Sequence, residues 1–210
     1  MPAEYLSSEY IKNKFSKPFV LGLAGVATVG KDTFYSLLKS HLADHGITIQ
    51  RFALADKLKD EIDPFLKERF GISAWTTDKV EKELIRPMLV AYGAVWRKRS
   101  MGTHWTKGIQ PRLEEAMSNG IFPVMTDIRY DEYEFDEAVW LNAIGGKLAH
   151  ISRYTEFNGA RTYVRPPNID EERNDPRLKA RSFVQIEWDT VSGPCIENRI
   201  QYLEQLIKAL

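Results

Sequence analysis

The chain has 210 residues, of which 43% are hydrophobic and 28% charged, a composition typical of a globular protein with one core. Its 29 Lys and Arg balance its 29 Asp and Glu, which argues against a nucleic-acid-coating or polybasic membrane-binding protein. The single cysteine excludes an intrachain disulfide, and neither a signal-peptide pattern nor a membrane-length apolar run occurs. We therefore expect a cytoplasmic protein without nucleic-acid or membrane partners.

Strand-like apolar runs alternate with segments of helical periodicity. Strands are predicted over residues 18–24, 47–52, 122–126, 147–152 and 183–188. Helices are predicted from residue 31 to Gly46 and over residues 55–70, 79–98, 105–119, 131–143 and 194–210, with Pro64 and Pro87 marking helix breaks or starts. The alternation predicts a three-layer α/β fold with a mostly parallel sheet, a helical insertion, and ligands at the carboxyl ends of the strands.

Residues 153–181 differ from the rest in composition. The segment is rich in arginine and proline and poor in apolar residues, so it cannot form much core; its arginines are Arg153, Arg161, Arg165, Arg173, Arg177 and Arg181. It is either a solvated, partly disordered loop or a mobile lid whose arginines close over an anionic ligand.

Residues 25–31 read GVATVGK and match the GxxxxGK pattern of a phosphate-binding loop. The match lies between a predicted buried strand and a predicted amphipathic helix, which is the context that such a loop requires. Backbone N–H groups of the loop and of the helix N-terminus surround phosphate oxygens there, while a lysine supplies positive charge. We therefore expect Gly25, Val29, Gly30 and Lys31 to bind a nucleoside triphosphate.

The position after Lys31 departs from the usual pattern, because Asp32 stands where a Ser or Thr normally ligates magnesium, and Thr33 follows. Thr33 takes over the hydroxyl role, or Asp32 acts as a carboxylate through water on Mg²⁺ or near the transferred phosphoryl group. Alternatively, Asp32 only favours the helix N-terminus through its charge. The sequence leaves these alternatives open.

A carboxylate and an arginine follow the predicted strand at residues 122–126. Asp127 stands where a carboxylate holds magnesium-bound water or orients a phosphate acceptor, and Arg129 could bind the acceptor phosphate. The simpler alternative is a helix-capping Asp and a surface Arg. Together with the loop, the pair favours a catalytic role for Lys31, Asp32, Asp127 and Arg129.

Several other basic and aromatic residues are weaker candidates for the same cleft. Lys57 or Lys59 opens a predicted helix after a strand, and a solvated helix face is the simpler explanation for both. The remaining candidates for acceptor charge and for an aromatic surface beside a base are Arg86, Arg97, Lys98 and Trp105. By default Trp105 is a core residue and the charges belong to the surface.

These motifs occur in an order that resembles the bacteriophage-type deoxynucleoside monophosphate kinases, a branch of the P-loop nucleotide kinases. The matching stretches are GVATVGKDT at 25–33, LADKLKD at 54–60, AYGAVWR at 91–97 and TDIRYDEYEFDEA at 126–138. The resemblance spans roughly residues 19–153, with a looser match at residues 168–175. Some family members carry basic residues in the loop where this chain has Ala27 and Thr28.

The resemblance implies transfer of the γ-phosphoryl group of ATP to a deoxynucleoside 5′-monophosphate, with Mg²⁺, for DNA precursor synthesis. It implies one domain over residues 1–210, with a core at 18–152 and 182–210, a monophosphate-binding insertion at about 54–104 and a lid at about 153–181. A phage-encoded chain would act in the host cytoplasm.

The resemblance also implies a role for each site residue. The residues implied to hold ATP phosphates and metal are Gly30, Lys31, Asp32 and Thr33, with Arg153 and Arg165 from the lid. Those implied to line the monophosphate site are Lys59, Arg86, Arg97, Trp105, Asp127 and Arg129.

Three rival functions remain open at this stage. The first is another small-molecule P-loop kinase, such as a dephospho-coenzyme A or phosphomevalonate kinase. The second is a non-catalytic nucleotide-binding regulatory protein, and the third and weakest is a DNA-processing ATPase. The accepted bases, the exclusion of ribonucleotides and the choice between monomer and homodimer are not determined by the sequence.

Overall fold

The computed structural model describes residues 7–189 and 200–210. The helices in this part of the chain are α1 (Ser8–Lys14), α2 (Lys31–Ala43), α3 (Leu54–Phe70), α4 (Lys79–Arg99), α5 (Thr103–Ser118), α6 (Glu137–Ala143), α7 (Ile169–Arg181) and α8 (Ile200–Ala209). The strands are β1 (Leu21–Ala24), β2 (Ile49–Phe52), β3 (Phe122–Met125), β4 (Lys147–Phe157), β5 (Ala160–Tyr163) and β6 (Val184–Asp189).

The strands form one mostly parallel sheet. Its parallel part has the order β2-β3-β1-β4-β6, and β5 pairs antiparallel with the far end of β4. The expected α/β fold with a mostly parallel sheet is therefore confirmed. Because β1 lies between β3 and β4, the loop that follows β1 leaves the middle of the sheet at its carboxyl edge.

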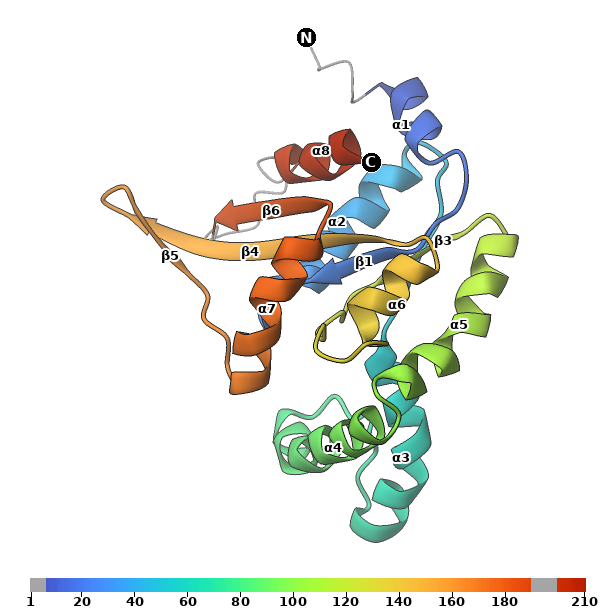
Figure 1. Ribbon diagram of the computed structural model, residues 1–210, viewed down its shortest axis with the longest axis vertical. Helices are drawn as coiled ribbons and strands as arrows, with labels where there is room; N and C mark the ends of the chain where they lie inside the picture. The colour runs from blue at the N-terminus through green and yellow to red at the C-terminus, as the bar shows by residue number, and fades with distance from the viewer. Residues whose placement is uncertain (1–6, 190–199) are drawn as a thin grey trace.

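Helices cover both faces of this sheet (Figure 1). Side chains alternate along a strand, so Leu21 and Leu23 of β1 pack with α1, α2 and α8. Val20 and Ala24 face the opposite way and pack with α5, α6 and α7. The result is three layers, with an apolar cluster on each side of the sheet. None of the helices in the described part of the chain has the length and apolar character that crossing a membrane requires.

The expected helical insertion is formed by α3 and α4, which lie beyond the sheet and have a small core of their own (Figure 1). That core consists of Ile62, Leu66, Ala74 and Ile85. The prediction that Pro64 and Pro87 mark helix breaks or starts is wrong, because both lie inside helices. Each proline is exposed, and so is the residue four positions before it, so water can satisfy the carbonyl that loses its helical partner.

The helix expected from residue 131 begins only at Glu137. The Asp136 carboxylate accepts hydrogen bonds from the backbone N–H groups of Glu132 and Tyr133, each at 2.8 Å. These bonds fold residues 132–136 into a non-helical turn before α6. The turn follows from a side chain competing with the helix for backbone donors.

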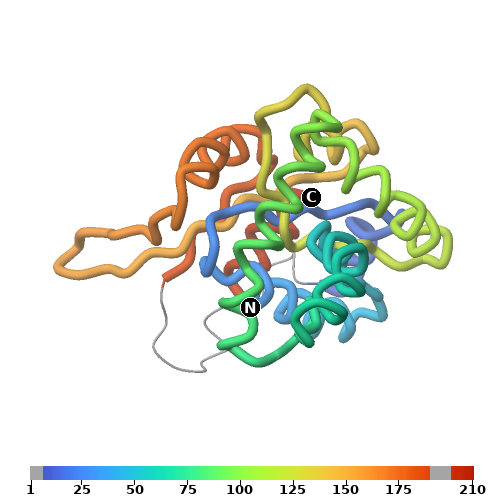
Figure 2. Tube along the Cα trace, turned by 90° about the horizontal axis from the view of Figure 1, so that it is seen from below, coloured from blue at the N-terminus to red at the C-terminus, as the bar shows by residue number. Residues whose placement is uncertain are grey.

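Most of residues 153–181 form strands and a helix instead of a loop. β4 continues to Phe157, pairs with β5 in a hairpin that projects from the molecule (Figures 1 and 2), and α7 follows. Asn168 caps α7 by accepting the N–H of Glu171 at 2.9 Å. As the composition indicates, the segment buries little, chiefly Tyr154, Asn174 and Leu178.

At the chain end, α8 agrees with the last predicted helix from residue 200 onward. The remainder of that prediction, residues 194–199 with Cys195, lies outside the described residues.

Candidate functional site

The glycine-rich loop, residues 25–30, joins the carboxyl end of β1 to the first turn of α2. Three of its residues, Gly25, Thr28 and Gly30, have positive φ angles of 126°, 68° and 98°. A Cβ atom at Gly25 would lie 2.2 Å from the carbonyl oxygen of Ile151, and one at Gly30 would lie 2.4 Å from the Trp188 ring. Both glycines are therefore required for the loop to fit against the sheet.

Lys31 is buried at the first position of α2 and turns back onto the loop. Its Nζ donates to the carbonyl oxygens of Gly25 and Val26, at 2.6 and 3.0 Å. Burial, and after it the positive charge of Arg129, lowers the pKa of Lys31 to about 8. At neutral pH the amine still carries its proton, so the loop holds a buried positive charge.

Asp32 and Thr33 lie exposed on the first turn of α2, and no side chain caps that helix at Gly30. The Asp32 carboxylate accepts a hydrogen bond from Arg51 Nε at 3.2 Å, and Arg51 also pairs with Asp56 at 3.2 Å. Asp32 thus presents an acidic group at the helix N-terminus, as its dipole favours. The sequence does not single out Arg51 for this contact.

Asp127 follows β3 and is buried. Its two carboxylate oxygens accept the N–H groups of Leu54 and Ala55 at the start of α3, at 3.0 and 2.9 Å. Burial raises the pKa of Asp127. The carboxylate therefore caps a helix, which is the simpler alternative that the sequence left open, and the capped helix is α3, from a distant part of the chain.

The backbone around Arg129 is held by a residue that sequence reasoning missed. The Glu137 carboxylate accepts the N–H groups of Arg129 and Tyr130 at 2.6 and 3.2 Å. Burial, and then the neighbouring charge of Asp127, raises the pKa of Glu137 to about 8. Nothing in the sequence distinguishes Glu137, the first residue of α6, from the acidic residues just before it.

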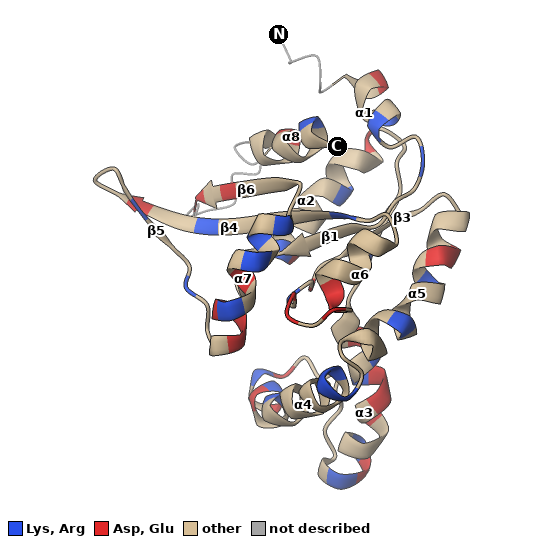
Figure 3. Ribbon diagram, viewed as in Figure 1, with Lys and Arg blue, Asp and Glu red and all other residues tan. Residues whose placement is uncertain are grey.

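A second missed residue, Glu171 in the first turn of α7, reaches the loop. Its Oε2 accepts the N–H of Ala27 at 2.6 Å, and its Oε1 lies 3.6 Å from Nη1 of Arg129. Figure 3 shows how acidic and basic residues are interspersed along α7. The acid-rich start of this helix was visible in the sequence, but only folding reveals which carboxylate meets the loop.

The structure brings the four predicted catalytic residues together. Arg129, Asp127 and Asp32 all lie close enough to Lys31 to shift its pKa, and so does Glu171. At the carboxyl ends of β1 and β3, the charge of buried Lys31 is thus influenced by three carboxylates and one guanidinium. Such a mixture of charges suits a polyanionic ligand with a cation, because ligand and cation replace the internal pairs.

Other predicted ligand residues have partners of their own. Arg86 is exposed and pairs with Glu83 on the same helix, at 2.8 Å. Lys59 lies over the ring of Trp75, 4.7 Å from its centroid. Trp105 is 6% exposed and belongs to the apolar cluster under α5, the default role for this residue. These contacts place none of the three beside Lys31.

Arg97 is buried in a polar cluster between α4 and the turn before α6. Its guanidinium donates from Nε and Nη2 to the two carboxylate oxygens of Asp136, at 3.0 and 2.7 Å. Glu132 accepts a third bond at 3.2 Å, and the ring of Tyr130 lies 3.7 Å from the guanidinium carbon. These bonds connect the helical insertion to the core, and they use the guanidinium for contacts within the protein.

The two arginines expected to act from the lid differ in setting. Arg153 lies half-buried in β4, paired in register with Trp188, and its Nε has no hydrogen-bond partner among the described residues. Arg165 is exposed in the connection between β5 and α7. Neither contacts the loop through a hydrogen bond or ion pair recorded in the described part of the chain.

Magnesium is the only metal that the sequence predicts, through Asp32 and Thr33. Within residues 7–189 and 200–210, no group of three or more His, Cys, Asp or Glu side chains is arranged to hold a metal ion. A carboxylate and a hydroxyl nevertheless fit Mg²⁺ bound to a nucleotide, because it takes one or two protein oxygens and completes its shell with phosphates and water.

Comparison of the chain with protein-family models finds no matching family, and comparison with curated proteins finds no significantly similar relative.

Proposed function

We propose that this protein is a P-loop kinase of the nucleoside monophosphate kinase type. It transfers the γ-phosphoryl group of ATP to a deoxynucleoside 5′-monophosphate and releases ADP and the diphosphate. The observation that carries the proposal is that a glycine-rich loop ending in buried Lys31 follows β1, while Asp127 and Arg129 follow the neighbouring parallel strand β3 at the same edge of the sheet. Lysine and arginine supply the charges that a transferring phosphoryl group and its acceptor need.

The position of the loop supports triphosphate binding. It leaves the central strand at the carboxyl edge of a parallel sheet, which is where ligands bind in open α/β folds. The loop runs directly into α2, whose N-cap residue Gly30 provides no capping side chain, so the N-terminus of the helix lies at the loop. Backbone donors and the helix dipole there favour phosphate oxygens.

The reaction needs no covalent enzyme intermediate. An oxygen of the acceptor phosphate attacks the γ-phosphorus in line, and the bond to the oxygen that bridges β- and γ-phosphate breaks. Lys31 exchanges the carbonyls of Gly25 and Val26 for phosphate oxygens, and its charge offsets the charge that builds up on them. Arg129 holds the acceptor phosphate, and Glu137 fixes the backbone that carries Arg129.

Asp32 and Thr33 are the residues that would hold Mg²⁺, directly or through water. The ion would neutralise the β- and γ-phosphates and set their orientation.

The test is an ATP-turnover assay with Mg²⁺ and a panel of acceptors: dGMP, dTMP, dCMP, dAMP, the ribose counterparts, dephospho-coenzyme A, phosphomevalonate and no acceptor. Acceptor-dependent turnover with deoxynucleotides is the expected result. Turnover with another acceptor alone would keep the kinase and change its substrate. Binding of ATP without any transfer would favour a nucleotide-binding regulatory protein.

Two variants locate the activity. Lys31→Ala should abolish transfer in a folded protein, and near wild-type turnover would contradict the assignment of the loop. Arg129→Ala should raise KM for the acceptor more than KM for ATP. Arg69→Ala serves as the matched control, because exposed Arg69 pairs with exposed Glu68 and is not among the predicted site residues.

A further inference from the structure

Glu171 occupies a position that a phosphate group would be expected to fill. One of its carboxylate oxygens accepts the N–H of Ala27 in the loop at 2.6 Å, and the other lies 3.6 Å from Arg129. The Glu171 side chain is 12% exposed, so this carboxylate is withdrawn from solvent. A backbone N–H of the loop and a guanidinium are the groups that a phosphate attracts, and a carboxylate attracts them for the same reason.

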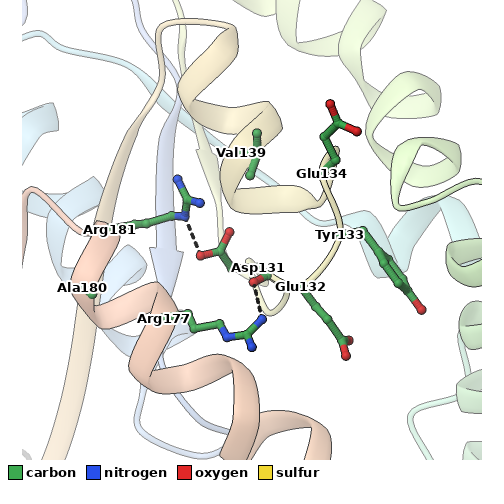
Figure 4. A pocket seen from close by; sticks show the side chains of 8 residues that line it. All are labelled: Asp131, Glu132, Tyr133, Glu134, Val139, Arg177, Ala180 and Arg181. Atoms are coloured by element: carbon green, nitrogen blue, oxygen red, sulfur yellow. Dashed lines mark hydrogen bonds and ion pairs between the residues drawn. The ribbon is translucent and has the colours of Figure 1, made fainter.

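The rest of α7 holds this carboxylate in place. Asn174 accepts the N–H of Asp131 at 2.8 Å, and Arg177 donates to the Asp131 carbonyl oxygen at 3.2 Å. Arg181 pairs with the Asp131 carboxylate at 2.5 Å, and Figure 4 shows Arg177 and Arg181 directed at Asp131. The helix is therefore fastened to the segment that carries Arg129.

A second fastening attaches α7 to the sheet. Asp175 lies 2.9 Å from Nε2 of buried His150 in β4, and Leu178 packs in the apolar cluster on that face. These contacts lie along the middle and the end of α7. Its first turn, which bears Glu171, is more exposed, and none of these attachments involves the Glu171 side chain, so displacing that side chain from the loop would leave them intact.

We propose that Glu171 is an intramolecular competitor for phosphate, which closes the loop and engages Arg129 until a triphosphate displaces it. The inference rests on the proposed function, because it requires that the loop bind phosphate. Displacement frees one backbone N–H and one guanidinium at the same time. Binding of the triphosphate thus also releases Arg129 for the acceptor, so each ligand should promote binding of the other.

The charge of Glu171 bears on Lys31 as well. Glu171 raises the pKa of Lys31, opposing the effects of burial and of Arg129. Removing this carboxylate leaves Lys31 and Arg129 with less compensating negative charge, and an incoming polyanion then meets a more positive site. Both effects act in the same direction on phosphate affinity.

The experiment is calorimetric titration of the full chain with inorganic tripolyphosphate, without a nucleoside and without Mg²⁺. Glu171→Ala should bind about tenfold tighter than the wild type, because the ligand no longer displaces a charge-assisted contact. Glu171→Gln keeps the shape and loses the charge, so its affinity should lie between the two. Glu172→Gln, at the exposed neighbouring position, is the matched control and should bind like the wild type.

Amide hydrogen exchange provides a readout that does not depend on phosphate. The Ala27 N–H should exchange faster in Glu171→Ala than in the wild type, with the α7 amides near Leu178 unchanged. Equal or weaker tripolyphosphate binding by both Glu171 variants would overturn the competitor role while leaving the loop as a phosphate site. Absence of binding by all four proteins would overturn the proposed function and this inference together.

Discussion

The indole Nε1 of Trp188 donates to the carbonyl oxygen of Val29 at 2.7 Å. Trp188 is the penultimate residue of β6, and its ring lies against Gly30, with its centroid 6.0 Å from that of Phe34. The last strand of the sheet thus supports the loop that the first strand begins. The shape of the loop depends on residues about 160 positions apart.

Trp188→Phe should weaken this support. The substitution removes the donor and part of a buried ring, and we expect a loss of roughly 2 kcal/mol in the free energy of unfolding. Urea denaturation measures that loss, and titration with tripolyphosphate measures the phosphate affinity of the loop. Trp140→Phe is the control. Half-buried Trp140 in α6 donates a hydrogen bond to Gln110 in α5 at 3.3 Å, so this variant also removes an indole donor. Unchanged phosphate affinity in Trp188→Phe would show that the loop keeps its shape without the indole.

Lys31 should make the free energy of unfolding depend on pH in the alkaline range. Its pKa is about 8 in the folded protein and 10.5 ordinarily, so between these values the unfolded chain binds the proton more tightly. Stability should therefore rise from pH 8 to pH 10.5, by on the order of 3 kcal/mol for this group. Lys31→Met should lack that rise, whereas exposed Lys39→Met should retain it. Parallel pH curves for wild type and Lys31→Met would disprove the lowered pKa.

Glu137 should have the opposite effect, at lower pH. Its pKa is raised from 4.5 to about 8, so the folded protein keeps a proton that the unfolded chain releases in this interval. This contribution to stability is complete below pH 4.5 and is lost as pH rises through 8, at about 1.4 kcal/mol per pH unit at most.

Glu137→Gln keeps an acceptor for the two backbone donors and cannot ionise. It should therefore become more stable than the wild type as pH rises toward 8, measured by thermal unfolding in matched buffers. Exposed Glu134→Gln is the control from the same segment. A difference between wild type and Glu137→Gln that does not change with pH would contradict the buried, protonated carboxyl.

Arg97→Met should lower the free energy of unfolding. Removing the guanidinium leaves the fully buried Asp136 without its oppositely charged partner, which typically costs about 3–5 kcal/mol. The double variant Arg97→Met, Asp136→Asn should recover part of the loss, and exposed Arg99→Met should show little. If Arg97→Met were as stable as the wild type and raised KM for the acceptor, the result would contradict the structural role and support a role for Arg97 in binding the acceptor.

Local pattern was enough to predict much of this protein. A buried strand followed by glycines and an amphipathic helix located the loop at Gly25–Lys31, and the alternation of periodicities predicted a mostly parallel sheet. These predictions hold because hydrophobic period and glycine placement depend on near neighbours in the chain. The prolines failed as helix boundaries, because exposure to water decides whether a broken backbone bond is tolerated.

The tertiary structure alone decided which charges meet. Arg97 and Arg129 were both candidates for the acceptor site, yet Arg97 is held in a buried ion pair with Asp136 whereas Arg129 is half exposed and lies near Glu171. Asp127 caps α3, and Glu171 reaches Ala27 across 144 positions. Such pairings arise because distant segments are packed against one sheet, and burial then determines which charged groups require a partner. Composition and residue spacing do not indicate which charged groups pair after folding. The position of the candidate site could therefore be predicted from the sequence, but the contacts within it could not.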